Sequence, residues 1–266
     1  MNLFAQVTSV SEGGATELLA NLSIPMIGFI ALILSIVRLG LLNPLSKKRP
    51  AGMARGIAEV CESLLVALVL VFLLIRPFLI QAFFIPSESM ETTLLGHTAG
   101  QGGHTDTVND HIFVNKMVFR YSDPQFKDII VFRAPKEADG ESLMRGLPQV
   151  ENVLIKRVIG VPGDTLEVKD EEVTKEGQKE MQKVVVRNGV KLVEPYIKEA
   201  MESPGSSGAH FAVDQPLKLG SDEYFVMGDN RNNSNDSRFW GVVKRNRIMG
   251  KASFVFMPFN RMGKIR

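Results

Sequence analysis

The sequence predicts a mainly β fold, a coiled antiparallel sheet or partly open barrel, anchored to a membrane by two N-terminal transmembrane helices. Both long apolar runs lie before residue 86, whereas beyond it the apolar residues gather in short runs rich in Val, Ile, Phe and Tyr. No long stretch after residue 86 repeats its apolar residues every 3.6 positions, so long helices are not expected there. The strand-rich part should therefore form a separate domain, residues 81–266.

The first apolar run, residues 22–42, contains a single charged residue, Arg38, near its end. About 20 residues of helix cross the ~30 Å hydrocarbon core of a bilayer, and an arginine near the end of a span can reach the interface. A second span is expected over residues 57–80, where Arg76 and Pro77 interrupt the apolar run. The alternative is a pair of buried core helices. A cleaved signal peptide is not expected, because the first 20 residues contain no Lys or Arg.

The charges around the two runs predict their orientation. The connecting segment, residues 43–56, carries no acid and four bases, Lys47, Lys48, Arg49 and Arg55. The N-terminal tail, residues 1–21, carries two acids and no base. Because basic segments stay in the cytoplasm, the connecting segment is expected there, and the tail and residues 81–266 outside. Cys61 is the only cysteine, so the outer domain should fold without an internal disulfide.

Within the outer domain the sequence predicts short strands separated by turn residues. The predicted strands are residues 110–121, 128–135, 151–160, 183–193, 223–229 and 251–259. Three polar stretches are predicted to be surface loops, residues 96–111, 136–149 and 169–183. The alternation of apolar side chains within the strands is expected to supply the core.

The histidines and the net charge bear on two further functions, metal binding and nucleic-acid binding. His97, His104 and His111 lie in one Gly-rich stretch with Asp106 and Asp110, but their spacing matches no common metal-ligand pattern. A plain polar loop is therefore favoured over a metal site, and no cofactor is expected. The net charge is only +2, and a nucleic-acid partner is not expected outside a membrane. The basic C-terminal end, from residue 242, fits either a face against anionic lipid or simple solubility.

The segment "FIPSESMETTL", residues 84–94, places several hydroxyl groups just beyond the second apolar run. A serine hydroxyl is a poor nucleophile unless a base takes its proton. In "NVLIKRVIGVPGD", Lys156 shares a strand face with Leu154 and Val158, and burial there would lower its pKa toward neutrality. The alternative is a lysine at a strand edge with its amine in water. A Ser-His-Asp triad has no positive support in the sequence.

Three motifs taken together, "FIPSESMETTL", "VLIKRVIGVPGD" and "MGDNRNNSNDSRFWG", resemble those of the bacterial type I signal peptidases. That resemblance implies a Ser/Lys endopeptidase that removes signal peptides from exported preproteins through an acyl-enzyme, cutting after small residues at −1 and −3. It implies that Ser89 is the nucleophile, Lys156 the general base and Ser87 an oxyanion-hole donor. The other implied residues are the base-orienting Ser234, the ion-pairing Arg157, Asp229, Asp236 and Arg238, and the pocket residues Phe83, Ile85, Met90, Leu94, Val131 and Ile155.

Two positions depart from the pattern of the family. Glu88 stands where many members have glycine, and "ETTL" follows Met90 where "xPTL" is common. Both lie beside the implied catalytic atoms, so they put the local backbone shape in doubt rather than the assignment.

The resemblance also implies a location and partners. The implied location is the cytoplasmic (inner) membrane, with the catalytic domain on its outer side. The implied partners are exported preproteins and membrane lipid, in proximity to the secretion translocon. A membrane-anchored, strand-rich binding module without chemistry is an alternative, and so is a relative specialised for a pilin or a conjugation substrate.

Overall fold

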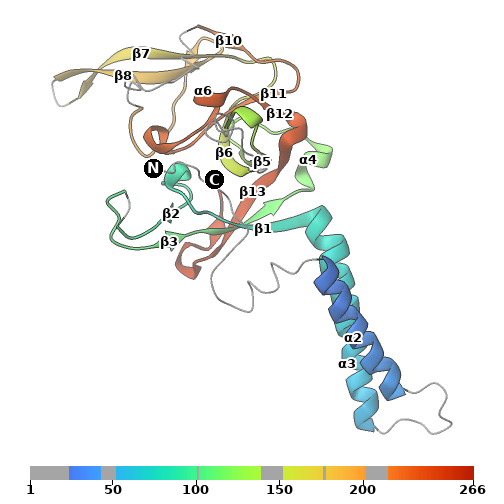
Figure 1. Ribbon diagram of the computed structural model, residues 1–266. Helices are drawn as coiled ribbons and strands as arrows, with labels where there is room; N and C mark the ends of the chain where they lie inside the picture. Colours follow the sequence, from blue (N-terminus) through green and yellow to red (C-terminus); the bar gives the residue numbers. More distant parts are fainter. Residues whose placement is uncertain (1–23, 43–51, 101, 139–151, 176–177, 202–214) are drawn as a thin grey trace. The chain divides into compact units, whose positions relative to one another are not determined.

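The computed structural model describes residues 24–42, 52–100, 102–138, 152–175, 178–201 and 215–266 (Figure 1). The chain divides into two compact units, one from Ser9 to Gln81 and one that includes Ala82 to Arg266. The predicted tail, residues 1–21, and most of the predicted connecting segment lie outside the described residues.

The first unit is helical. Helix α2 (Ile24–Leu42) packs against helix α3 (Gly52–Val69), which continues into a π-helical stretch from Leu70 to Leu79. Many apolar side chains of both helices are exposed, among them Phe29, Ile36 and Val60. No helix within the described residues is long and apolar enough to cross a membrane. The two spans, residues 22–42 and 57–80, stay predictions.

The second unit is built on an eight-stranded sheet with the order β1-β4-β13-β5-β6-β11-β12, in which β14 also pairs with β13. Its strands are β1 (Ile80–Phe84), β4 (His111–Asn115), β5 (Ile129–Arg133), β6 (Val153–Gly160), β11 (Glu223–Met227), β12 (Val243–Lys244), β13 (Ile248–Met257) and β14 (Gly263–Lys264). The pairs from β4 through to β12 are antiparallel, which confirms the predicted mainly β, antiparallel class. Register shifts along β13 bend that strand, as β-bulges do. The partly open barrel stays a prediction.

Smaller elements complete this unit. A four-stranded sheet has the order β10-β7-β8-β9, and a two-stranded sheet joins β2 to β3. Their bounds are β2 (Gly96–His97), β3 (Val108–Asn109), β7 (Thr165–Lys175), β8 (Gln178–Arg187), β9 (Val190–Lys191) and β10 (Leu217–Lys218). The short helices and 3-10 turns are η2 (Glu88–Met90), α4 (Val118–Tyr121), η3 (Lys136–Ala138), η4 (Arg231–Asn233), α6 (Ser237–Trp240), η5 (Arg245–Arg247) and η6 (Phe259–Arg261).

Some predicted elements are wrong. Residues 169–183 were expected to form a loop, but all of those described belong to the ribbon of β7 and β8. Charged residues occupy both faces of this ribbon, so the sequence lacks the alternation that marks a half-buried strand, and cross-strand pairs such as Asp170 with Lys183 help to hold it. The predicted loop 96–111 contains strands β2 and β3 and the first residue of β4. Of the predicted loop 136–149, the described part is the turn η3, and residues 139–149 lie outside the described residues.

The predicted strand 110–121 is correct only in part. Its first half is β4, but residues 118–121 form helix α4. The reason is local, because the side-chain oxygen of Asn115 accepts hydrogen bonds from the backbone N–H groups of Met117 and Val118. An asparagine bonded in this way starts a helical turn and ends the strand.

Strand β6 is buried on both faces, and this places its polar residues in the protein interior. Leu154 and Val158 pack in one core cluster, with Phe132 and Trp240. Ile155, from the opposite face, packs in a second cluster. Lys156 lies on the same face as Leu154 and Val158, as the alternation of the strand predicts.

Candidate active site

Lys156 is the buried lysine of the candidate site. It pairs with Ile130 of β5 in the sheet register, and only 1% of its surface is exposed. Burial, which disfavours the ammonium form, lowers the pKa of Lys156 from 10.5 to about 8, although Asp236 and Asp229 act in the opposite direction. An appreciable fraction of these amines is therefore neutral near physiological pH.

Ser89 lies against this lysine, on the turn η2 that follows β1. The Lys156 Nζ donates a hydrogen bond to the Ser89 Oγ over 2.7 Å, and both residues are buried. The backbone N–H of Asn230 donates to the Ser89 carbonyl over 3.2 Å and so ties the turn to the segment after β11. A hydroxyl in direct contact with an amine that can lose its proton is the arrangement that nucleophilic catalysis requires.

Ser87 is the residue that precedes the turn. Its Oγ lies 3.3 Å from the Ser89 Oγ, and either hydroxyl can be the donor. The backbone of Ser87 is closely covered by β2, since a Cβ added at Gly96 would lie only 2.5 Å from the Ser87 nitrogen. Only glycine at position 96 permits this approach, which fixes the strand beside the turn.

Ser234 also comes close to Ser89. It is buried, and a Cβ added at Gly228 would overlap both its Oγ and the Ser89 carbonyl oxygen, so a glycine at position 228 lets the two segments meet. Among the described residues, the Ser234 Oγ is one of the buried polar atoms without a hydrogen-bond partner. Its role in orienting the lysine stays a prediction.

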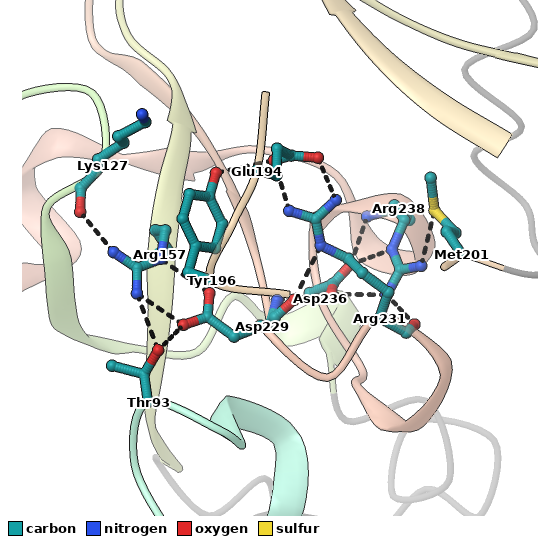
Figure 2. Close-up of polar contacts among 11 residues, drawn as sticks. Thr93, Lys127, Arg157, Glu194, Tyr196, Met201, Asp229, Arg231, Asp236 and Arg238 are labelled. Atoms are coloured by element: carbon teal, nitrogen blue, oxygen red, sulfur yellow. Dashed lines mark hydrogen bonds and ion pairs between the residues drawn. The ribbon is translucent and has the colours of Figure 1, made fainter. Parts of the chain in front are cut away.

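The four residues expected to form ion pairs do form them (Figure 2). Arg157 holds Asp229 with two hydrogen bonds, of 2.8 and 2.6 Å, and the Thr93 hydroxyl donates to the same carboxylate. Arg238 donates to Asp236 over 2.8 Å and also to the carbonyl of Arg231, which braces the loop that carries Ser234.

The electrostatics of Asp236 affect the lysine directly. Burial favours the neutral acid, but Arg238 and the N–H of Gly228 outweigh it and hold the pKa of Asp236 below its ordinary value. Asp236 is therefore ionised near the Lys156 amine and limits how far burial lowers the pKa of Lys156.

A second set of buried polar residues was not identified by the sequence analysis. Arg231 makes hydrogen bonds of 2.8 and 2.7 Å to the two carboxylate oxygens of Glu194, and Tyr196 donates to Glu194 over 2.8 Å (Figure 2). The Arg157 guanidinium lies 4.1 Å from the centre of the Tyr196 ring. Glu194 and Tyr196 follow β9 in a segment with no strand or helix pattern, so no sequence signal marks their burial against the two arginines.

The six residues expected to line the substrate pockets lie together. All belong to one buried core cluster, and each is at most 4% exposed: Phe83, Ile85, Met90, Leu94, Val131 and Ile155. They come from β1 and the residue after it, from η2 and the segment after it, and from β5 and β6; Ser89 lies on η2 and Lys156 on β6. Whether they also contact a substrate stays a prediction.

Comparison with known proteins gives consistent similarities. The family model described as signal peptidase, peptidase S26, matches residues 57–257. A signal peptidase I from Leptolyngbya laminosa is 38% identical over 191 residues, which cover 72% of this chain and 75% of that protein. A signal peptidase I from Bacillus amyloliquefaciens is 31% identical over 223 residues, which cover 83% and 99%. A solved signal peptidase I from Enterococcus faecalis V583 is 28% identical and covers 50% of this chain and 98% of that chain, with a TM-score of 0.33.

Proposed function

The chain belongs to the signal peptidase family, peptidase S26, and from this we propose that Ser89 and Lys156 are the dyad with which it cleaves preproteins. It is a serine endopeptidase of the signal peptidase I type, and it removes signal peptides from exported preproteins. The hydrogen bond of 2.7 Å between the Lys156 Nζ and the Ser89 Oγ is the observation that supports this assignment of residues.

In the proposed mechanism, neutral Lys156 accepts the proton of the Ser89 hydroxyl while the Oγ attacks the carbonyl carbon of the scissile peptide bond. The carbonyl oxygen becomes an oxyanion, which accepts hydrogen bonds from the Ser87 hydroxyl and the Ser89 backbone N–H. The C–N bond then breaks, and the Lys156 ammonium gives its proton to the leaving amine. The acyl-enzyme remains, with the signal peptide esterified to Ser89.

Deacylation uses the same base. Lys156 takes a proton from a water molecule, whose oxygen attacks the ester, and returns the proton to Ser89 as the signal peptide leaves. Throughout, the amine needs a neutral partner that fixes its direction, because a carboxylate there would favour the ammonium form. The unpartnered Ser234 Oγ, close to the Ser89 backbone, supports Ser234 in this role.

Substrate selection is assigned to the buried apolar cluster beside the dyad. Shallow apolar pockets accept small side chains and exclude large ones by steric overlap, and the preference for small residues at −1 and −3 follows from the family. All six candidate pocket residues lie in one cluster, and one of them, Met90, is next to Ser89 in the chain, which supports this assignment.

The location is proposed to be the cytoplasmic membrane, with the catalytic domain on its outer face and near the secretion translocon. The exposed apolar side chains of α2 and α3 and the basic residues of segment 43–56 support anchoring in this orientation. Protease added outside intact spheroplasts should digest the domain beyond residue 86 and leave the segment from Lys47 to Arg55 intact. Digestion of that segment with protection of the catalytic domain would contradict the proposed orientation.

The proposed catalytic roles can be tested by cleavage of a purified preprotein by the full-length enzyme in detergent. Ser89→Ala should abolish cleavage, because no other group can form the acyl-enzyme. Ser87→Ala should lower turnover by about 10²–10³-fold with little change in KM, because one oxyanion donor is lost. An active Ser89→Ala enzyme, or full turnover by Ser87→Ala, would remove that residue from the mechanism.

A further inference from the structure

Two histidines of the Gly-rich stretch, residues 96–111, lie next to a glutamate that follows η2, the turn that carries Ser89 and is called the catalytic turn below. His97 lies on β2, His104 follows in the loop toward β3, and Glu91 directly follows the turn η2. One potential ligand atom from each of the three residues lies within 4.8 Å of the other two. No other such group of three occurs among the described residues.

His97 is oriented like a metal ligand. Its Nδ1 lies 2.6 Å from the Glu91 Oε1, and because an ionised carboxylate can only accept, the proton is on Nδ1. The Nε2 then carries a lone pair, and it is buried without a hydrogen-bond partner, 3.5 Å from the Asp106 Oδ1. For Glu91 and His97 to hold the same ion, the ion replaces the proton between the His97 Nδ1 and the Glu91 Oε1, so that this nitrogen and a Glu91 oxygen become ligands and the ring proton lies on Nε2, toward Asp106.

His104 provides a second unpartnered nitrogen. Its buried Nε2 lacks a hydrogen-bond partner and lies 3.6 Å from the Glu88 Oε1 and 3.7 Å from the Glu91 Oε2. Two ligand atoms on one tetrahedral zinc ion lie about 3.3 Å apart, so small movements bring this nitrogen and a carboxylate oxygen to coordinating distance. The two rings are stacked 3.7 Å apart, and one ring must turn out of the stack for both nitrogens to reach the same ion.

The local charge is suited to a dication. The Glu91 side chain is 3% exposed. Its carboxylate accepts a hydrogen bond from the Lys198 amine over 3.0 Å and lies 2.6 Å from the His97 Nδ1. Glu88 and Asp106 add two further acids around the histidines, whereas Lys198, 3.0 Å from the Glu91 Oε2, is the cation that contacts this carboxylate. With 32% of its side chain exposed, Lys198 can withdraw into water.

We propose that Glu91, His97 and His104, with Glu88 in reach, bind one divalent ion of the zinc class. Imidazole nitrogens together with a carboxylate favour zinc and similar transition metals over magnesium and calcium. The sequence favoured a plain polar loop because the spacing of the histidines matches no common metal-ligand pattern; the third ligand, Glu91, lies outside the Gly-rich stretch. Since Glu88 and Glu91 flank Ser89, an ion here ties that stretch to the catalytic turn.

The test is metal binding by the full-length protein in detergent, after removal of metal with a chelator. Titration with Co²⁺, followed by its visible absorption, and equilibrium dialysis with Zn²⁺ should both give one ion per chain. His97→Gln and His104→Gln should each weaken binding at least about 10-fold. Lys198→Met should strengthen binding, because it removes the cation that competes for Glu91.

The matched control is His111→Gln, which removes a histidine at the edge of the same stretch and should leave the affinity unchanged. Because His104 is partly exposed, His104→Gln should keep the fold, and unchanged thermal unfolding of the metal-free variant checks this. The absence of stoichiometric binding, binding retained in both histidine variants, or weaker binding by Lys198→Met would overturn the site. Binding is measured without cleavage, so its failure is separate from any failure of the Ser/Lys mechanism.

Discussion

Replacing Lys156 with alanine should lower signal-peptide cleavage by at least about 10²–10⁴-fold, which is the usual contribution of a general base. Lys156→Arg should be equally inactive, because a guanidinium stays protonated and cannot accept the proton of the Ser89 hydroxyl. The measurement is single-turnover cleavage of a preprotein by the full-length enzyme. An active Lys156→Ala enzyme would contradict the proposed dyad, and inactivation of a folded histidine variant would favour a triad instead.

The pH dependence of the wild-type enzyme should report the same lysine. With a pKa of about 8, roughly one Lys156 in ten is neutral at pH 7, compared with about one in 3,000 at the ordinary value of 10.5. The rate should therefore stay low in acid and rise as the pH increases through about 8. Ser234→Asp adds a negative charge near the Lys156 amine. It should therefore raise the pKa of Lys156 and move the rise of the cleavage rate to higher pH. A rate that does not change between pH 6 and 9 would rule out Lys156 as the base.

A stability measurement separates lost chemistry from lost folding in the lysine variants. The pKa of Lys156 is lower in the folded protein than in the unfolded chain, so between about pH 8 and 10.5 the unfolded chain binds more protons. Folding stability therefore rises with pH through this window, and below it the buried amine costs about 3 kcal/mol. Lys156→Met removes the charge but keeps an apolar stem, and at pH 7 it should unfold at a higher temperature than the wild type while being inactive.

Replacing Asp229 with alanine should destabilise the catalytic domain by about 3–5 kcal/mol, because it leaves a buried guanidinium without its partner. Arg157 and Asp229 are 2% and 0% exposed, and the Thr93 hydroxyl would lose its acceptor as well. The measurement is urea or thermal unfolding of the full-length protein in detergent. The control is Lys244→Ala, which removes surface ion pairs with Asp222 and Glu223 and should change the stability far less. An Asp229→Ala loss no larger than that of Lys244→Ala would show that the buried pair contributes little.

The sequence by itself determined the antiparallel β class and most of the sheet, and it placed Lys156 on an apolar strand face. The predicted strands 128–135, 151–160, 223–229 and 251–259 correspond to β5, β6, β11 and β13. These strands pack against a core, so burial requires runs of apolar residues or an alternation of apolar and polar residues. Both patterns are visible in a few consecutive residues. The motifs around Ser89, Lys156 and Ser234 were also identifiable, since each is a local set of residue types.

Only the tertiary structure decided which of these residues meet. The Ser89 and Lys156 contact joins residues 67 positions apart, and the Arg231 and Glu194 pair joins residues separated by 37. Helix α4 interrupts a run that was predicted as strand, and the β7–β8 ribbon forms where charge suggested a loop. Glu91 joins His97 and His104 only because β2 folds back over the turn η2. Contacts of this kind depend on strand register and on the close approach of backbones at Gly96 and Gly228, which no local pattern of hydrophobicity or charge records.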